Sequence, residues 1–159
     1  MTMEYPDSVE QDLKNNSITN EETVKVLWSQ TYNTAGKPDW SHIMPFYTED
    51  VYFRDTVQEL RGMTDFKAMT ERLTKRSKDL TMNVIRAVMR ENIVFIEWEM
   101  TIGFKKYPNS IMYGASRLTL NENGKIREQR DYYDLWGDIF DNIPRFGKMY
   151  RRFMHRKFG

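Results

Sequence analysis

The spacing of apolar residues changes near residue 80 and divides the chain into a helical part and a strand-rich part. Before that point apolar residues recur three and four positions apart, which is typical of an amphipathic helix. The first such run follows Thr19 and Glu22, a pair spaced as a capping box, and we expect it to end near Gly36 and Pro38. Its buried face would consist of Val24, Leu27, Trp28 and Thr31.

Two further helices are predicted before the period changes. Asp39 can cap a short helix over residues 40–46, which Pro45 should kink or end. Thr64 can cap a longer helix after an Arg61-Gly62 turn, and the last turn of that helix is basic. Residues 51–55, between the two helices, have the composition of a short strand.

After residue 80 the alternation has a period of two, and it predicts strands over residues 80–90, 92–104, 110–120 and 125–136. Short turns separate these strands at residues 91–92, 107–109 and 121–124, which favours an antiparallel meander. We therefore expect the α+β class, with a curved antiparallel sheet and three N-terminal helices on its concave face. Such a sheet, closed by helices, encloses a cone whose mouth can bind a ligand.

The two ends of the chain differ from the middle. Residues 1–18 are polar and aperiodic and predict a flexible segment, whereas residues 19–143 form the expected domain. Residues 144–159 predict a basic amphipathic helix. That helix could close its own pocket, pack on a partner or lie on an anionic membrane as a peripheral contact. No nucleic-acid partner is predicted, because its aromatic residues share one stripe rather than forming a stacking platform.

The composition of the chain limits the types of catalytic group that it can supply. The 159 residues contain no Cys and two His, so thiolate chemistry is excluded, and a catalytic triad or a multi-histidine metal site has little material. We predict no metal and no cofactor, which leaves carboxylates, tyrosines and lysines as acids and bases. The chain shows neither a membrane-spanning apolar run nor a signal peptide, so a cytoplasmic protein is expected.

Asp131 is the first candidate for a functional residue. Strand alternation places it on one face with Arg127, Gln129 and Tyr133, but neither face of that strand is plainly apolar. The residue therefore either points into the cone, where burial would raise its pKa, or forms an ion pair with a neighbouring arginine. Asp55 poses a similar choice between a pocket residue and a residue that initiates a turn.

Several phrases resemble one family. They are Phe46 to Asp55, Arg61-Gly62, Asn123-Gly124-Lys125-Ile126 and Arg130-Asp131-Tyr132-Tyr133-Asp134. Over residues 20–143 the chain resembles the SnoaL-like branch of the nuclear-transport-factor-2-like superfamily. The resemblance implies a cystatin-like cone and a homodimer through the outer sheet face. The superfamily includes ketosteroid isomerases, limonene-1,2-epoxide hydrolases, SnoaL-type polyketide cyclases and non-catalytic binding proteins, so the fold does not decide the function.

The resemblance also implies roles for individual residues. Asp131 matches the pocket aspartate of the epoxide hydrolases, but Trp98 and Met100 stand where their arginine and second aspartate would be. That departure argues against epoxide hydrolysis, which needs two carboxylates held by an arginine. Asp55 matches the general base of the ketosteroid isomerases, and Ser116 stands at the position of their oxyanion-binding aspartate. Asp131 and Asp55 are thus the candidate catalytic residues.

The other predicted lining residues are Trp28, Tyr32, Trp98, Met100, Met112, Ser116 and Tyr133. The aromatic residues either donate hydrogen bonds to a ligand or belong to the core, and the methionines suit a cavity of irregular shape. We expect a protein that binds a small, largely apolar molecule. If it is an enzyme, its chemistry would be cofactor-independent isomerisation or cyclisation; the alternative is a non-catalytic binding or interaction module.

Overall fold

A curved sheet of six strands is the frame of the molecule in its computed structural model, which describes residues 4–32, 37–104 and 109–159. The strands lie in the order β2-β1-β6-β5-β4-β3. Neighbouring strands are antiparallel except β1 and β6, which run parallel, so the sheet is mixed rather than wholly antiparallel as predicted. No tight turn joins β1 to β6, and their direction is therefore not fixed by a hairpin. The α+β class is confirmed.

The four long strands follow the predicted meander. They are β3 (Ser77–Arg90), β4 (Ile93–Phe104), β5 (Ser110–Leu120) and β6 (Ile126–Tyr133). The turns after β3 and β5 are confirmed, and Gly124 takes a positive φ of 70° in the second of them. The predicted turn at residues 107–109 falls largely outside the described residues. β6 ends at Tyr133 rather than at residue 136, because Asp134 caps the next segment by accepting hydrogen bonds from Trp136 N and Gly137 N.

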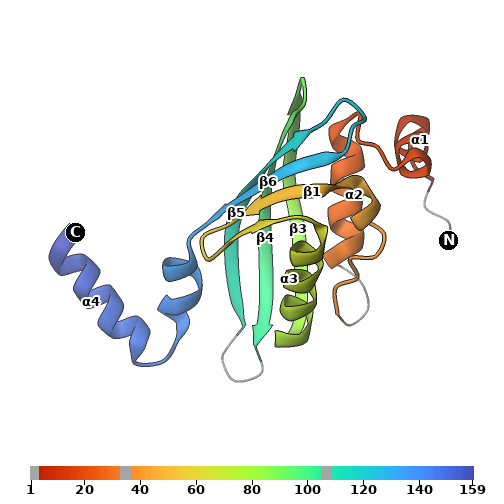
Figure 1. Ribbon diagram of the computed structural model, residues 1–159. Helices are drawn as coiled ribbons and strands as arrows, with labels where there is room; N and C mark the ends of the chain where they lie inside the picture. Colours follow the sequence, from red (N-terminus) through yellow and green to blue (C-terminus); the bar gives the residue numbers. More distant parts are fainter. Residues whose placement is uncertain (1–3, 33–36, 105–108) are drawn as a thin grey trace.

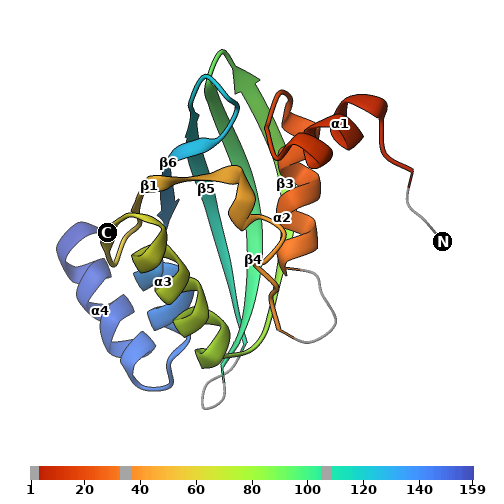
Figure 2. The same ribbon diagram turned by 45° about the vertical axis from the view of Figure 1, so that its right-hand side comes forward.

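Two long helices cover one face of this sheet (Figures 1 and 2). They are α2 (Glu21–Tyr32) and α3 (Met63–Arg76). The predicted caps are wrong for both helices. Asn20 Oδ1, not Thr19, accepts the hydrogen bond of Thr23 N at 3.1 Å. Helix α3 is preceded by Gly62, whose φ is 86°, and has no side-chain cap.

The segment between α2 and α3 is less helical than predicted. Residues 40–46 form turns and a short 3₁₀ helix, η1 (Met44–Phe46), instead of an α-helix. Asp39 closes a local turn by accepting a hydrogen bond from Ser41 N at 2.9 Å. The strand β1 (Tyr47–Arg54) starts earlier than predicted and pairs with the short β2 (Glu59–Arg61), which the sequence pattern does not predict.

The N-terminal segment is not structureless over its length. Helix α1 (Asp7–Asn15) buries Val9 completely, and Asp12 is 3% exposed. The Asp12 carboxylate accepts hydrogen bonds from Thr19 N, Thr19 Oγ1, Asn20 Nδ2 and Thr23 Oγ1 at distances of 2.6 to 3.2 Å. This polar anchor holds α1 to the start of α2 together with the buried Val9 and the partly buried Leu13. Two apolar positions are too few for apolar periodicity to predict a helix here.

The chain leaves the sheet through two short helical turns and ends in a helix. These are the π-helical turn η2 (Leu135–Ile139), the 3₁₀ turn η3 (Phe140–Asn142) and α4 (Phe146–Phe158). In Figure 1, α4 extends from the end of this segment and stands apart from the sheet. In the part of the chain that the structure describes, no helix combines the length and the apolar character needed to cross a bilayer.

Replacing Asp12 with Ala should destabilise the fold by about 2–4 kcal/mol, because it removes a charged acceptor and leaves several donors without their partner. Urea denaturation of the whole chain measures this loss. Glu10→Ala, at an exposed position of the same helix, is the matched control and should change the free energy of unfolding by less than about 0.5 kcal/mol. Equal effects of the two substitutions would contradict the anchoring role of Asp12.

Candidate functional site

A cavity of about 490 Å³ lies between the covered face of the sheet and helices α2 and α3. Most of its wall is apolar: the sheet contributes Trp98, Met100 and Met112, and the helices contribute Trp28, Met69 and Leu73. The segment after β6 closes one side with Leu135, Ile139 and Phe140. A wall of this kind is typical of sites for small organic molecules.

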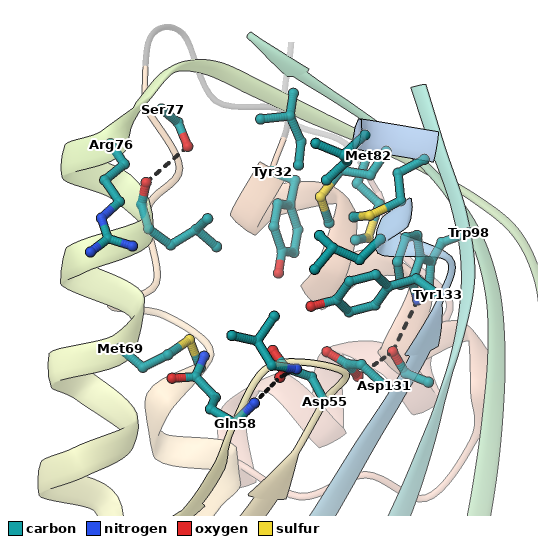
Figure 3. A pocket seen from close by; sticks show the side chains of 18 of the residues that line it. Tyr32, Asp55, Gln58, Met69, Arg76, Ser77, Met82, Trp98, Asp131 and Tyr133 are labelled. Carbon is teal, nitrogen blue, oxygen red and sulfur yellow. Dashed lines mark hydrogen bonds between the residues drawn. The ribbon is translucent and has the colours of Figure 1, made fainter. Parts of the chain in front are cut away.

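The structure brings all nine residues that the sequence analysis singles out to this one cavity. They are Asp131, Asp55, Trp28, Tyr32, Trp98, Met100, Met112, Ser116 and Tyr133. Figure 3 shows the side chains of Asp55, Asp131 and Tyr133 pointing into the same space, with Tyr32 on its opposite side. Their common location follows from the fold, whereas their roles in binding or catalysis stay predictions.

Asp131 is held by neutral hydrogen-bond donors. Its Oδ1 atom accepts hydrogen bonds from Ser116 Oγ at 2.7 Å and from Gln129 Nε2 at 2.9 Å. Trp98 Nε1 donates to Ser116 Oγ at 3.0 Å, and Tyr47 OH donates to Gln129 Oε1 at 2.5 Å. An indole N–H can only donate, so Ser116 must accept from Trp98 and point its own proton at Asp131. The two outer donors therefore orient the two inner ones.

Strand register places these groups next to one another. Ser116 on β5 is directly opposite Asp131 on β6, and Gly114 is opposite both Trp98 on β4 and Tyr133 on β6. A Cβ atom at Gly114 would lie 2.4 Å from the Trp98 ring. Glycine at this position therefore gives the indole room to lie against β5, where its N–H reaches Ser116.

Two of the arginines that could have paired with Asp131 have other partners. Arg117 forms a salt bridge with Glu128, and the guanidinium of Arg130 lies 4.9 Å from the centroid of the Tyr132 ring. Asp131 is half-buried and lines the cavity, so a bound molecule can reach it. Of the two alternatives drawn from the sequence, the structure therefore places Asp131 at the cavity, held by Ser116 and Gln129.

The environment of Asp131 raises the pKa of its carboxyl group toward neutral pH. Burial raises the pKa of Asp131 to about 6, although the hydrogen bonds from Ser116 and Gln129 oppose the shift; the negative charge of Asp55 adds to it. A carboxyl group with this pKa is mostly ionised at pH 7 but is easily protonated. It can therefore act as a base in one step and as an acid in the next.

Asp55 both closes a turn and lines the cavity. Its Oδ1 atom accepts hydrogen bonds from Val57 N at 2.7 Å and Gln58 N at 2.8 Å, which closes the turn between β1 and β2. The same residue lines the cavity beside Tyr133. Burial, and then the negative charges of Asp55 and Asp131, raise the pKa of the Tyr133 phenol. The phenol consequently stays protonated and can serve as a hydrogen-bond donor to a ligand.

Three residues at or behind the cavity were missed by sequence reasoning. Gln129 lies two positions before Asp131 on the same strand face, which is the signal that could have identified it. Tyr47 supports Gln129 from behind, while its ring packs against Phe66 at a centroid distance of 4.7 Å. Trp40 lines the cavity, and its buried Nε1 atom has no hydrogen-bond partner among the described residues, so it is a further candidate donor.

The residues of the site offer little to a metal ion. Across residues 4–32, 37–104 and 109–159, no group of three or more His, Asp or Glu side chains is placed to hold one. The polar side chains that line the cavity are two carboxylates, two phenols, two guanidinium groups and several neutral groups; they are Asp55, Asp131, Tyr32, Tyr133, Arg72, Arg76, Trp40, Gln58, Gln129, Asn142, Ser77, Ser110 and Ser116. These groups can orient a small molecule and transfer a proton.

Comparison with known proteins identifies a family. A family model described as a SnoaL-like domain matches residues 28–129, which is more than half of the chain. A search of curated protein sequences finds no significant match. The family is therefore indicated by the domain model and by the fold.

Solved structures with the same fold have diverse descriptions. A hypothetical protein with a ketosteroid isomerase-like fold from Catenulispora acidiphila, in complex with trimethylamine, has a TM-score of 0.64 and 16% identity, covering 81% of this chain and 95% of its own. An epoxide hydrolase from M. tuberculosis, described as LEH-like, has a TM-score of 0.63 and 14% identity, covering 87% of this chain and 96% of its own. A candidate SnoaL-like polyketide cyclase from Shewanella putrefaciens has a TM-score of 0.60 and 15% identity, covering 94% and 99%. At these identities the similarity shows the fold alone.

Replacing Asp131 with Asn should alter how stability depends on pH. The folded-state pKa of Asp131 is raised to about 6, whereas in the unfolded chain it should be about 3.9. Between these values the folded protein binds more protons than the unfolded chain, so the stabilising contribution is complete below the lower pKa and is lost as the pH rises through the higher one. Between about pH 4 and about pH 7, the free energy of unfolding of the wild type should fall relative to that of Asp131→Asn by up to about 3 kcal/mol.

Urea denaturation over this pH range measures the difference. Asp50→Asn, at an exposed residue of β1, is the control and should follow the wild-type profile. Parallel profiles for the wild type and Asp131→Asn would show that the pKa of Asp131 is not raised in the folded protein.

Proposed function

The chain belongs to the SnoaL-like domain family, and from this membership and the cavity we propose that it binds a small, largely apolar molecule and moves a proton on it with Asp131. The observation that carries the proposal is a reachable carboxylate, held by Ser116 and Gln129 in an apolar cavity, whose pKa burial raises to about 6. Such a group is a suitable general acid and base near neutral pH.

The wall of the cavity defines the class of molecule. Aromatic rings and thioethers favour an apolar, ring-containing body, and the volume of about 490 Å³ suits a small organic molecule. Asp131, Asp55 and Tyr133 lie together at the cavity, so the end of the ligand that lies against them should carry an oxygen function. A ketone or enone with an apolar skeleton has this combination.

The proposed reaction is a proton shift without a cofactor. Asp131 removes a proton from the carbon next to a carbonyl group, and the pair of electrons left behind is delocalised onto the carbonyl oxygen. Tyr133 and Trp28 orient the substrate, and a phenol donor at the oxygen stabilises the developing negative charge. Asp131 then returns the proton to another carbon of the conjugated system. In a cyclisation, the carbanion instead attacks a second carbonyl carbon, the π electrons of that carbonyl move to its oxygen, and Asp131 returns the proton to the resulting alkoxide.

Asp55 is the second carboxylate in this proposal. Its negative charge contributes to raising the pKa of Asp131 and that of Tyr133, so it keeps both groups in useful protonation states. Trp98 and Met100 supply neither charge nor acid, and the indole of Trp98 is already bonded to Ser116. Epoxide hydrolysis is therefore not part of the proposal.

A homodimer is the proposed assembly. The outer face of the sheet carries exposed apolar side chains opposite the buried ones, and such a patch is typical of a protein interface. Its members are Ile85, Val88, Phe95, Ile111, Tyr113 and Tyr132, each between 42% and 63% exposed. A second copy of the chain, packed on this face, would cover them.

One observation favours a non-catalytic binding module as the second candidate. Asp55 closes the turn after β1 through two backbone hydrogen bonds, which explains its presence without any reaction. In this alternative Asp131 accepts a hydrogen bond from a donor on the ligand when it is ionised, or donates one to the ligand when it is protonated, and no covalent bond is broken. The two candidates therefore differ in proton transfer and not in binding.

Hydrogen–deuterium exchange at carbon separates them. The whole chain is incubated in deuterated buffer with a panel of one- to four-ring ketones, and binding and loss of the proton next to the carbonyl are both followed by NMR. We expect Asp131→Asn to bind the same ketones with exchange at least about 100-fold slower than the wild type. The wild-type rate should rise with pH through about 6, where the base becomes ionised.

Asp50→Asn serves again as the exposed control and should exchange like the wild type. Binding without any difference in exchange between the wild type and Asp131→Asn would reject the enzymatic proposal and leave the binding module. Failure of the wild type to bind any member of the panel would contradict the proposed ligand class.

A further inference from the structure

Helix α4 has an apolar half and a basic half. At about 3.6 residues per turn, one side of the helix carries Phe146, Met149, Tyr150, Phe153, Met154 and Phe158. The other side carries Lys148, Arg151, Arg152, His155 and Arg156. Lys157 lies on the apolar side, where a long side chain can extend its charged end toward water.

The first part of the apolar half packs against the rest of the protein, whereas most of its remaining side chains are exposed. Phe146 and Tyr150 stack on Trp136 at centroid distances of 6.4 and 6.1 Å, and Phe146 also packs against Phe140 at 5.8 Å. Three large apolar side chains beyond this contact are exposed to 62%, 48% and 77% in the described structure; they are Met149, Phe153 and Phe158. Exposure of this size on one helix face is typical of a surface that binds something.

Charge narrows the choice of partner. Residues 145–159 contain six Lys or Arg and no acidic residue, while the chain as a whole has a net charge of +1. Arg151 pairs with Asp141 at 2.9 Å, and the side chains of Lys148, Arg152, Arg156 and Lys157 are exposed. A second copy of α4 would bring like charges together, and a nucleic acid would satisfy the cations but not the apolar half.

The helix is also free of the cavity. In the described structure the residues that line the cavity end at Ile143, so α4 does not close the cavity itself. Its contacts with the fold are with η3 and with the aromatic ring of Trp136 (Figure 1). The exposed half of α4 therefore has no task in the cavity.

We infer that α4 binds the surface of an anionic phospholipid bilayer. The helix would lie in the plane of the interface, with Met149, Phe153 and Phe158 among the acyl chains and the basic residues at the headgroups. This arrangement satisfies both halves of the helix at once, because interfacial helices combine buried apolar area with attraction to anionic lipids.

The position of α4 connects this surface with the cavity. Phe140 lines the cavity and packs against Phe146 at the base of α4. Docking therefore brings the segment that closes one side of the cavity to the lipid surface, from which an apolar ligand could enter. This consequence rests on the proposed function, whereas the docking itself does not.

Co-sedimentation of the whole chain with lipid vesicles tests the inference. We expect binding to vesicles of phosphatidylcholine mixed with phosphatidylglycerol, and binding at least about tenfold weaker to phosphatidylcholine alone. Lys148→Gln with Arg152→Gln should weaken binding to the anionic vesicles at least about tenfold. Met149→Ser with Phe153→Ser should have an effect of similar size through lost apolar burial.

Matched controls make each comparison specific. Lys67→Gln with Lys75→Gln removes two exposed cations from α3, and Val57→Ser changes an apolar residue that is 64% exposed, compared with 62% for Met149. Both should bind like the wild type. Asp131→Asn should also bind like the wild type, so that loss of the proposed function and loss of docking are distinguished.

Three results would overturn the inference. One is equal binding of the wild type to neutral and anionic vesicles, including no binding to either. Another is wild-type binding by the Met149→Ser and Phe153→Ser variant, which would leave an unspecific attraction of charges. The third is tighter binding to a DNA duplex than to the anionic vesicles under the same conditions.

Discussion

The hydrogen bonds that Ser116 and Gln129 donate to Asp131 are the contacts on which the arrangement of the cavity depends. A carboxylate at an apolar wall is costly unless it is hydrogen-bonded, and neutral donors satisfy it without fixing its charge as an arginine would. Burial raises the pKa more than these two donors lower it, so the result is a value of about 6. Proton transfer near neutral pH follows from this balance.

The pairing of the strands fixes the positions of the groups that set the pKa of Asp131. Three neighbouring strands supply Trp98, Ser116 and the pair Gln129 and Asp131, and the register between β5 and β6 sets Ser116 opposite the carboxylate. Because the outer donors Trp98 and Tyr47 orient the inner ones, the donors are aligned before a ligand arrives. Helices α2 and α3 add apolar side chains to the wall of the same space.

Much of the fold could be predicted from the sequence, since the period-two alternation after residue 80 and the turn at Gly124 are local signals. The parallel pairing of β1 with β6 depends on residues far apart in the chain, and the short β2 has too few residues to show a pattern. Helix α1 was missed because Asp12, a polar residue, anchors it. In the site, strand alternation could not decide which way Asp131 points. Gln129, which shares its face, is buried although it is polar, so polarity does not mark the exposed face of this strand.

The account rests on the protonation of one carboxyl group, which NMR can observe directly. A titration of the side-chain carboxyl carbon of Asp131 in the whole chain, assigned by its absence in the Asp131→Asn spectrum, gives the pKa in the folded protein. We predict a midpoint at about 6. A midpoint near the ordinary value of about 3.9 would contradict the account, because the carboxylate would then be as well solvated as one on the surface.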